Sequence, residues 1–110
     1  MYEQGEILVV PFPFSDLSSI KQRPVLVLSK KEDNLSSNEV ITCGITSNLK
    51  DKKYAVQVRN EDLQRGSIPK KSMIKTNKLF TIDKKIVIKS VARINVQKWS
   101  EVKKEFFSLL

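Results

Sequence analysis

Arg23 is the side chain whose type and position most favour chemistry. It ends a thirteen-residue link, residues 11–23, between two apolar runs, and it directly precedes Pro24. Because a proline biases the residue before it toward an extended conformation, the guanidinium is expected to point from the mouth of a strand toward the link. A link of this length is unusual in a compact domain unless it has a function. A solvated arginine at a strand start is the alternative interpretation.

Two neighbouring hydroxyls, those of Thr46 and Ser47, end a later apolar run and form a second candidate group. Hydroxyls donate to the oxygens of anions, but Thr and Ser are also common at strand ends, and the local sequence alone favours that second role. Asp16, within the link, is either a proton acceptor or a residue that fixes the link through a turn hydrogen bond. We favour the turn for Asp16.

The chain has no histidine and a single cysteine, Cys43. Zinc sites of the usual histidine type, cysteine metal clusters, Ser-His-Asp triads and histidine acid–base chemistry are therefore excluded, as is an intrachain disulfide. Because Ile41 and Ile45 flank Cys43, we expect a small buried side chain in a strand rather than a reactive thiol. We predict neither a metal nor another cofactor.

Basic residues outnumber acidic ones, with 20 Lys and Arg against 12 Asp and Glu and a net charge of +8. A positive field of this size on a small domain attracts polyanions, although a generally basic surface is the simpler alternative. The N-terminus lacks the basic and apolar segments of a signal peptide, and no segment approaches the ~20 apolar residues of a membrane span. We therefore expect a soluble, cytoplasmic protein without a membrane partner.

Short apolar runs rich in β-branched residues predict strands rather than helices. Five or six such strands with one terminal helix favour a mainly β fold, a small and partly open barrel in a single domain, residues 1–110. Pro11 and Pro13 cannot donate ladder hydrogen bonds, so the first strand should end there. The expected strands are residues 7–10, 25–28, 40–45, 54–58, 70–75 and 86–93.

The segments between these strands and the end of the chain complete the prediction. Residues 30–38 predict a connecting loop that can include one helical turn, and residues 76–85 predict a connection that places Leu79, Phe80 and Ile82 in the core. Asn95 suits a helix N-cap, and the terminal helix is expected to lie across the barrel as a lid. Its apolar face would comprise Val96, Trp99, Val102, Phe106, Leu109 and Leu110.

Three separated segments of the chain match sequence motifs of a known protein family and occur in the same order. They read G-E-I-L-V-V-P-F-P-F-S-D-L with K-Q-R-P-V-L-V-L-S (residues 5–17 and 21–29), V-I-T-C-G-I-T-S-N (residues 40–48) and L-F-T-I-D (residues 79–83). Together they resemble the MazF/PemK family of bacterial toxins, small endoribonucleases of toxin–antitoxin pairs. Each segment alone is a weak signal, whereas the combination is specific.

The resemblance implies a fold, an activity and partners. The fold would be an SH3-like barrel of the type shared with the toxin CcdB, assembled as a homodimer. The activity would be sequence-specific, metal-independent cleavage of single-stranded RNA by attack of the ribose 2′-hydroxyl on the adjacent phosphate. The partner would be an antitoxin whose acidic, disordered tail folds on binding. The alternative is a non-catalytic barrel that binds nucleic acid or, like CcdB, targets a protein.

The same resemblance assigns roles to residues. Arg23 and Thr46 match residues of the family's active site, with Ser47 assisting. Since a guanidinium pKa above about 12 makes proton transfer unfavourable, we assign Arg23 to stabilise charge on phosphorus. Some members carry an arginine and an acid at the positions of Lys75 and Asn77. The Asn77 amide accepts no proton, so this version of the mechanism does not transfer, although Lys75 can still hold phosphate.

Binding of the RNA is assigned to a basic groove. Lysines would track its phosphates, Phe12 or Phe14 would stack an unpaired base, and amide side chains would read base edges. Ordinary surface charge and packing under the link are the simpler interpretations. The expected binding residues are Phe14, Lys21, Gln22, Asn48, Lys70, Lys71, Lys75 and Asn77.

Overall fold

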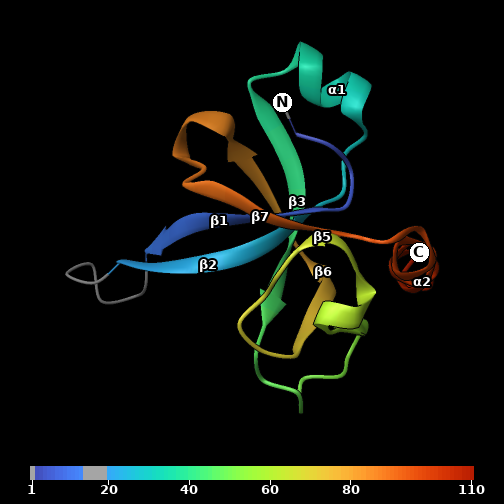
Figure 1. The fold of residues 1–110 in the computed structure, drawn as a ribbon. Coiled ribbons are helices and arrows are strands. Elements are labelled where there is room, and N and C mark those ends of the chain that lie inside the picture. The colour runs from blue at the N-terminus through green and yellow to red at the C-terminus, as the bar shows by residue number, and fades with distance from the viewer. Residues whose placement is uncertain (1, 14–19) are drawn as a thin grey trace.

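The computed structural model describes residues 2–13 and 20–110 of the chain. These residues form strands, two α-helices and two short 3₁₀ helices (Figure 1). The helices are α1 (Lys31–Ser36), η1 (Asn60–Asp62), η2 (Lys84–Ile86) and α2 (Val96–Phe107). The strands are β1 (Glu6–Pro13), β2 (Ile20–Val27), β3 (Glu39–Thr46), β4 (Ala55–Val58), β5 (Leu63–Gly66), β6 (Ser72–Asp83) and β7 (Lys89–Ile94).

The seven strands form one antiparallel sheet in the order β4-β6-β3-β2-β1-β7-β5. The central pair is the β1–β2 hairpin, in which Val10 lies opposite Arg23. Val56 of β4 and Ala92 of β7, near opposite ends of this order, belong to the same core cluster. The sheet therefore curls into a half-barrel, as Figure 1 shows, which confirms the predicted mainly β barrel with a C-terminal helix.

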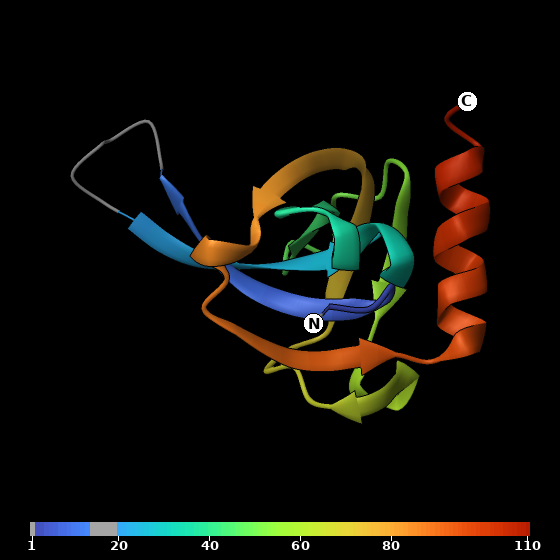
Figure 2. The ribbon, with the colours of Figure 1, turned by 90° about the horizontal axis from the view of Figure 1, so that it is seen from above.

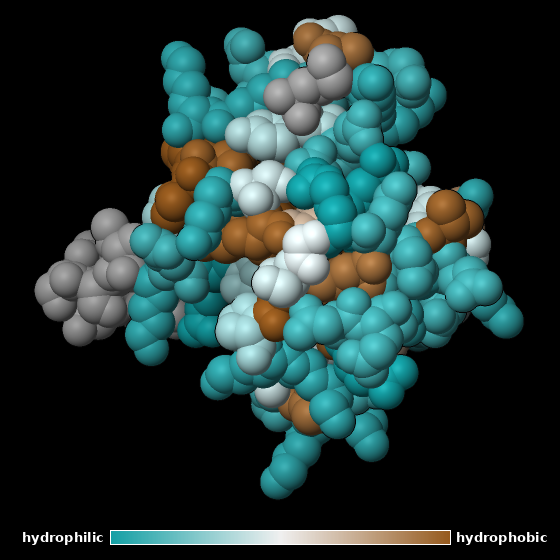
Figure 3. Space-filling view, in the orientation of Figure 1, coloured by the Kyte–Doolittle hydropathy of each residue, from teal (hydrophilic) through white to brown (hydrophobic). Residues whose placement is uncertain are grey.

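The middle of the sheet is apolar on both faces. Ile7 and Leu26 belong to one buried cluster, whereas their neighbours Leu8 and Val25 belong to a second cluster on the other face. Burial on two faces explains why these strands read as continuous apolar runs rather than as alternating ones. The outer surface is different, since the face seen in Figure 3 is mostly hydrophilic with apolar side chains in separate patches.

Helix α2 begins as the sequence predicts. The Asn95 side chain accepts a hydrogen bond from the Lys98 backbone N–H at 2.8 Å, which satisfies a donor of the first turn. Figure 2 shows α2 standing beside the sheet, away from the far ends of β1 and β2. Val102 is its one buried residue, and Val96 is exposed, so the predicted apolar face is only partly used. Within residues 2–13 and 20–110, no helix is long and apolar enough to span a membrane.

The prediction that the first strand ends at Pro11 is wrong. Strand β1 continues to Pro13, and its pairing with β2 includes Pro11 opposite Gln22. Because Pro11 and Pro13 are two residues apart, their backbone nitrogens, which carry no hydrogen, face the same side of the strand. Pairing of β1 with β7 stops at Val9, so on that side no ladder hydrogen bond is lost.

The prediction that residues 76–85 form a connection is also wrong. Strand β6 runs through them to Asp83, and the register with β3 jumps from Gly44 opposite Lys75 to Cys43 opposite Leu79. The residues between Lys75 and Leu79 form a bulge, which interrupts the period of two by which a strand is recognised. The bulge leaves Phe80 and Leu79 at 37% and 48% exposure instead of in the core, while Ile82 is buried.

Two further short elements complete the fold. Residues 30–38, expected as a loop that can include one helical turn, contain the six-residue helix α1, whose buried Asn34 donates hydrogen bonds to the backbone carbonyls of Tyr2 and Ser29. Strand β5 was not predicted, because it has four residues and only Leu63 is apolar. It is held by pairing with β7, a tertiary contact without a local signal.

Cys43 is fully buried in β3, as predicted, and burial raises the pKa of its thiol to about 12. Because the thiolate is the reactive form, the folded protein should stay unmodified by iodoacetamide at pH 8. Mass spectrometry of samples with and without 6 M guanidinium chloride would measure this directly. Full alkylation of the folded protein at the rate of the unfolded chain would contradict the burial of this thiol.

Candidate active site

A cavity of about 230 Å³ opens between β1, β2, β3 and β6. It brings together side chains that are far apart in the sequence, among them the predicted Arg23 and Thr46. Cations and aromatic rings share its wall. The lining residues are Phe12, Arg23, Pro24, Gly44, Ile45, Thr46, Lys75, Lys78 and Phe80.

Strand register explains why Arg23 and Thr46 converge. Val25 lies opposite Gly44 across the β2–β3 pair. Side chains two positions apart project from the same face of a strand, so Arg23 and Thr46 lie on the face of Val25 and Gly44. Gly44 in turn lies opposite Lys75 of β6. The bare backbone of Gly44 leaves the space between these side chains open.

The same alternation separates Ser47 from Thr46 and Gln22 from Arg23. Ser47 and Gln22 line a second cavity, of about 360 Å³, together with Lys70. Arg23 and Pro24 border both cavities. They lie in the middle of β2, which begins at Ile20, so the expectation that Arg23 precedes the strand is wrong. The predicted set of Arg23, Thr46 and Ser47 therefore does not share one cavity.

The Thr46 hydroxyl is oriented by its own turn. Its Oγ1 accepts a hydrogen bond from the Asn48 backbone N–H at 3.1 Å. The Asn48 side-chain Oδ1 in turn accepts from the Lys50 backbone N–H at 3.1 Å. Because Asn48 donates to Oγ1, the proton of the Thr46 hydroxyl can be donated to an oxygen in the cavity.

Lys75 lies beneath the cavity rather than at its mouth. It is 2% exposed, and its Nζ donates to Asp51 Oδ1 at 2.6 Å and also to the Lys53 backbone carbonyl. The Asp51 carboxylate reaches Lys78 Nζ at 3.8 Å with its other oxygen. Lys78, with a side chain 57% exposed, is therefore the cation nearer solvent, and the sequence analysis missed it because it lies in the β6 bulge.

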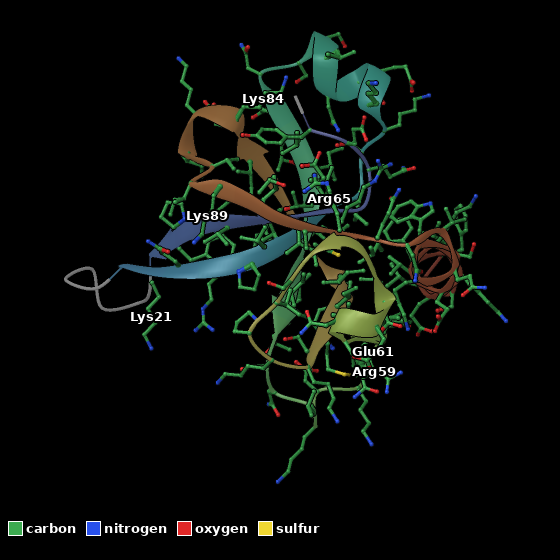
Figure 4. All side chains as sticks on the ribbon, viewed as in Figure 1. Lys21, Arg59, Glu61, Arg65, Lys84 and Lys89 are labelled. Carbon is green, nitrogen blue, oxygen red and sulfur yellow. The ribbon has the colours of Figure 1, made fainter. Side chains whose placement is uncertain are left out.

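Other predicted residues lie outside the first cavity. Asn77 is exposed in the bulge, Lys71 is exposed before β6, and Lys21 is exposed on β2. Figure 4 shows Lys21 near the far end of the hairpin. Asp16 and Phe14 fall outside the described residues, so their assigned roles stay predictions. Glu6 serves a structural purpose, since its buried carboxylate accepts from Ser90 Oγ at 2.6 Å and from Arg65 at 3.2 Å.

The ion pair below the cavity should be visible in acid. The hydrogen bond from Lys75 lowers the pKa of the Asp51 carboxyl below its ordinary 3.8. A lowered folded-state pKa gives stability that is present above the unfolded pKa and lost as the pH falls through the folded value. Asp51→Asn should therefore be less stable than wild type at pH 7, with the difference shrinking below about pH 4.

Urea unfolding of both proteins at pH 7 and at pH 2.5 measures this difference. Glu61→Gln, which removes an exposed carboxylate 3.7 Å from Arg59, is the matched control and should change stability little at either pH. A stability difference between Asp51→Asn and wild type that is equal at the two pH values would contradict the role of the carboxylate charge.

Comparison with known proteins gives the family. The family model of the PemK-like, MazF-like toxin of type II toxin–antitoxin systems matches residues 3–110. The chain belongs to this family. Among curated proteins, no sequence gives a significant match. The family assignment confirms the resemblance inferred from the three sequence segments.

Solved structures of two MazF proteins and of a further endoribonuclease share the fold. A MazE–MazF structure from Deinococcus radiodurans has a TM-score of 0.79 at 18% identity, covering 98% of this chain and 94% of the other. An endoribonuclease with its cognate antitoxin from a mycobacterial species has a TM-score of 0.74 at 13% identity, covering 98% and 93%. Mycobacterium tuberculosis toxin MazF-mt6 has a TM-score of 0.71 at 15% identity, covering 92% and 93%. At these identities the likeness shows that this MazF-like toxin has their fold.

Proposed function

We propose that this toxin is a sequence-specific, metal-independent endoribonuclease that cleaves single-stranded RNA. The observation that carries the proposal is the convergence of Arg23 and Thr46 in one cavity, with Lys78 at the same wall. A guanidinium, a hydroxyl and an ammonium are the donors that an extra negative charge on phosphorus requires. Membership of a family of toxin endoribonucleases supports the same activity.

The proposed reaction is an internal transfer. The ribose 2′-oxygen attacks phosphorus as its proton leaves, and the bond from phosphorus to the 5′-oxygen breaks as that oxygen gains a proton. The products are a 2′,3′-cyclic phosphate and a 5′-hydroxyl. Arg23 stabilises the charge on the non-bridging oxygens through two parallel hydrogen bonds, and Thr46 donates a third. This assignment uses Arg23 as a permanent cation and not as an acid or a base.

Asn77 and Asp51 are both unsuited to accept the proton of the 2′-hydroxyl. The Asn77 amide has no basic oxygen, and Asp51 is held by Lys75 with a lowered pKa, which makes it a weak base. Asp16 is the remaining candidate acceptor among the predicted residues, although its sequence context favours a turn hydrogen bond. An Asp16→Asn variant that keeps full activity would leave Asp16 with the turn alone.

The remaining contacts would extend the site along the RNA. Lys21, Lys70 and Lys71 are exposed and supply positive charge for phosphates, in keeping with the net charge of +8. Gln22 and Asn48, also exposed, would read base edges and supply sequence specificity. Cleavage of RNA, the proposed activity, would take place in the cytoplasm.

The same positive surface suits an antitoxin. Structures of the related MazF from Deinococcus radiodurans include MazE–MazF complexes. We propose that the antitoxin of this toxin carries an acidic segment, disordered when free, that covers the basic residues around the cavity and excludes RNA. In this mode of inhibition, RNA and the antitoxin segment should compete for the toxin, and added salt should weaken the binding of both.

The chain has an apolar surface groove that a homodimer could bury. A groove of about 380 Å³ runs between β3, β6 and α2, on the side of Trp99 and Phe107. Ile41 and Leu79, at 49% and 48% exposure, border it. We propose that a second copy of the chain covers this groove. Light scattering should give twice the 12.6 kDa chain mass for the wild type and a lower mass for Phe107→Lys. A wild-type monomer at micromolar concentration would overturn this part of the proposal.

The activity is tested with purified protein and a long unstructured RNA in excess EDTA. Discrete cuts at a common short sequence are expected, and sequencing of the fragments would give that sequence. No cleavage by a folded protein across many sequences would favour the second candidate, a CcdB-like toxin that targets a protein. The amide at Asn77, where some family members carry an acid, is the observation that keeps this candidate open.

A further inference from the structure

The first cavity has an aromatic wall that the phosphate chemistry does not use. We propose that Phe80, supported by Phe12, is a stacking platform for an unpaired base next to the phosphate held by Arg23 and Thr46. The inference rests on the proposed ribonuclease function and adds to it a base-binding subsite. The ligand is the nucleobase of a single-stranded RNA.

The two rings form a fixed pair with one open side. Their centroids are 4.9 Å apart and the ring planes are tilted by 55°. Phe12 is half-buried and packs against the second core cluster, which fixes its position. Phe80 remains 37% exposed. A large aromatic ring that is held from behind and open in front can stack a base with little loss of side-chain freedom.

Two residues of β3, Thr42 and Gly44, keep the Phe80 ring beside the cavity. Thr42 lies opposite Phe80 in the β3–β6 pair, and its Oγ1 donates to the Phe80 carbonyl at 3.0 Å. A Cβ on Gly44 would lie 3.4 Å from Phe80 Cε2 and 3.8 Å from Lys78 Cβ. Because Gly44 has no side chain, the volume between the ring and the cations stays open.

The charges around the ring favour a nucleotide over an apolar partner. Arg23 and Lys78 line the same cavity as Phe80, above the buried Lys75. An apolar side chain placed there would bring no charge to these cations while it displaced their water, which is unfavourable. A nucleotide provides a flat base for the ring and a phosphate for the cations in a single unit.

The experiment compares ring variants on intact and abasic substrates. Phe80→Leu removes the ring at similar apolar volume, Phe80→Trp keeps a ring, and Thr81→Ala, the next residue of the strand, is the control. With an RNA that holds one mapped cut, Phe80→Leu should raise KM by about 5- to 150-fold, the range for loss of one stacked base, with kcat changed less. Phe80→Trp and Thr81→Ala should stay within a few-fold of wild type.

A second arm replaces each base near the cut, one at a time, by an abasic site. At one position, the abasic site should raise the KM of wild type by about the same factor as Phe80→Leu raises KM on intact RNA. The same abasic site should raise the KM of Phe80→Leu little further. Thermal unfolding of each variant confirms that it is folded. Equal losses for wild type and Phe80→Leu at every position would overturn the platform, because a purely structural role of Phe80 does not depend on a base.

Failure of the underlying function would be seen separately. If wild type cuts no RNA, the ribonuclease proposal fails, and the same variants are then compared by fluorescence anisotropy for binding of a labelled single-stranded RNA of mixed sequence. Weaker binding of intact RNA by Phe80→Leu than by wild type, with no such difference on abasic RNA, would support the platform. Equal affinities of Phe80→Leu and wild type would overturn it as well.

Discussion

Replacement of Arg23 by alanine is expected to slow RNA cleavage by about 10²- to 10³-fold, a loss of about 2.7–4 kcal/mol of transition-state stabilisation. Arg23 lines the cavity with Thr46, and its cation is the donor best suited to two phosphate oxygens at once. Because these bonds strengthen as charge develops on phosphorus, kcat should fall more than KM rises. Single-turnover cleavage of one mapped RNA site measures the effect.

Arg59→Ala is the matched control for Arg23→Ala. It removes the same charge from an exposed side chain that pairs with Glu61 at 3.7 Å. Figure 4 shows Arg59 and Glu61 below and to the right of the centre of the molecule, far from Lys21 at the left. Cleavage by Arg59→Ala should stay within a few-fold of wild type. A wild-type rate for Arg23→Ala, with Arg59→Ala equally active, would remove Arg23 from the site.

Replacement of Gly66 by alanine is expected to destabilise the fold by about 3 kcal/mol or more. Gly66 has a φ of +78°, and a Cβ there would lie 2.0 Å from the Val91 carbonyl oxygen and 2.6 Å from Ala92 Cα. Since both atoms belong to the backbone of β7, no side-chain movement relieves the clash. For a domain of this size the midpoint of thermal unfolding should fall by about 12 °C or more.

Gly44→Ala is the contrasting change. The nearest atoms to its added Cβ belong to side chains, at 3.4 and 3.8 Å, so the fold should tolerate it far better. Calorimetry of the two variants beside wild type would separate the effects. A Gly66→Ala protein that unfolds within about 2 °C of wild type would contradict the tight pairing of β5 with β7.

The family resemblance assigned Arg23 and Thr46 to the site, and both side chains line one cavity. Arg23 before Pro24 and Thr46 at the end of β3 converge because each lies two positions from residues that pair across the sheet, Val25 and Gly44. The burial of Cys43 was predictable from the local sequence, because Ile41 and Ile45 flank it in an apolar run. The N-cap at Asn95 follows from local chemistry alone.

Residues governed by tertiary contacts were not predictable in this way. The bulge in β6 exists because its two halves pair with β3 in different registers, and it brings Lys78 and Phe80 to the cavity. The pairing of Asp51 with Lys75 joins a turn to a strand 24 residues later. Gln22 and Ser47 face the other cavity because they alternate with Arg23 and Thr46, but the motif alone groups Ser47 with Thr46.

The most direct test of the account is the role of the ribose hydroxyl at the cut. An RNA with one mapped cut site is compared with the same RNA carrying a single 2′-deoxy nucleotide on the 5′ side of the scissile phosphate, both in excess EDTA. We expect the intact RNA to yield a 2′,3′-cyclic phosphate and a 5′-hydroxyl, and the deoxy RNA to remain uncut at that position. Cleavage of the deoxy RNA at the same position and rate would contradict attack by the 2′-hydroxyl.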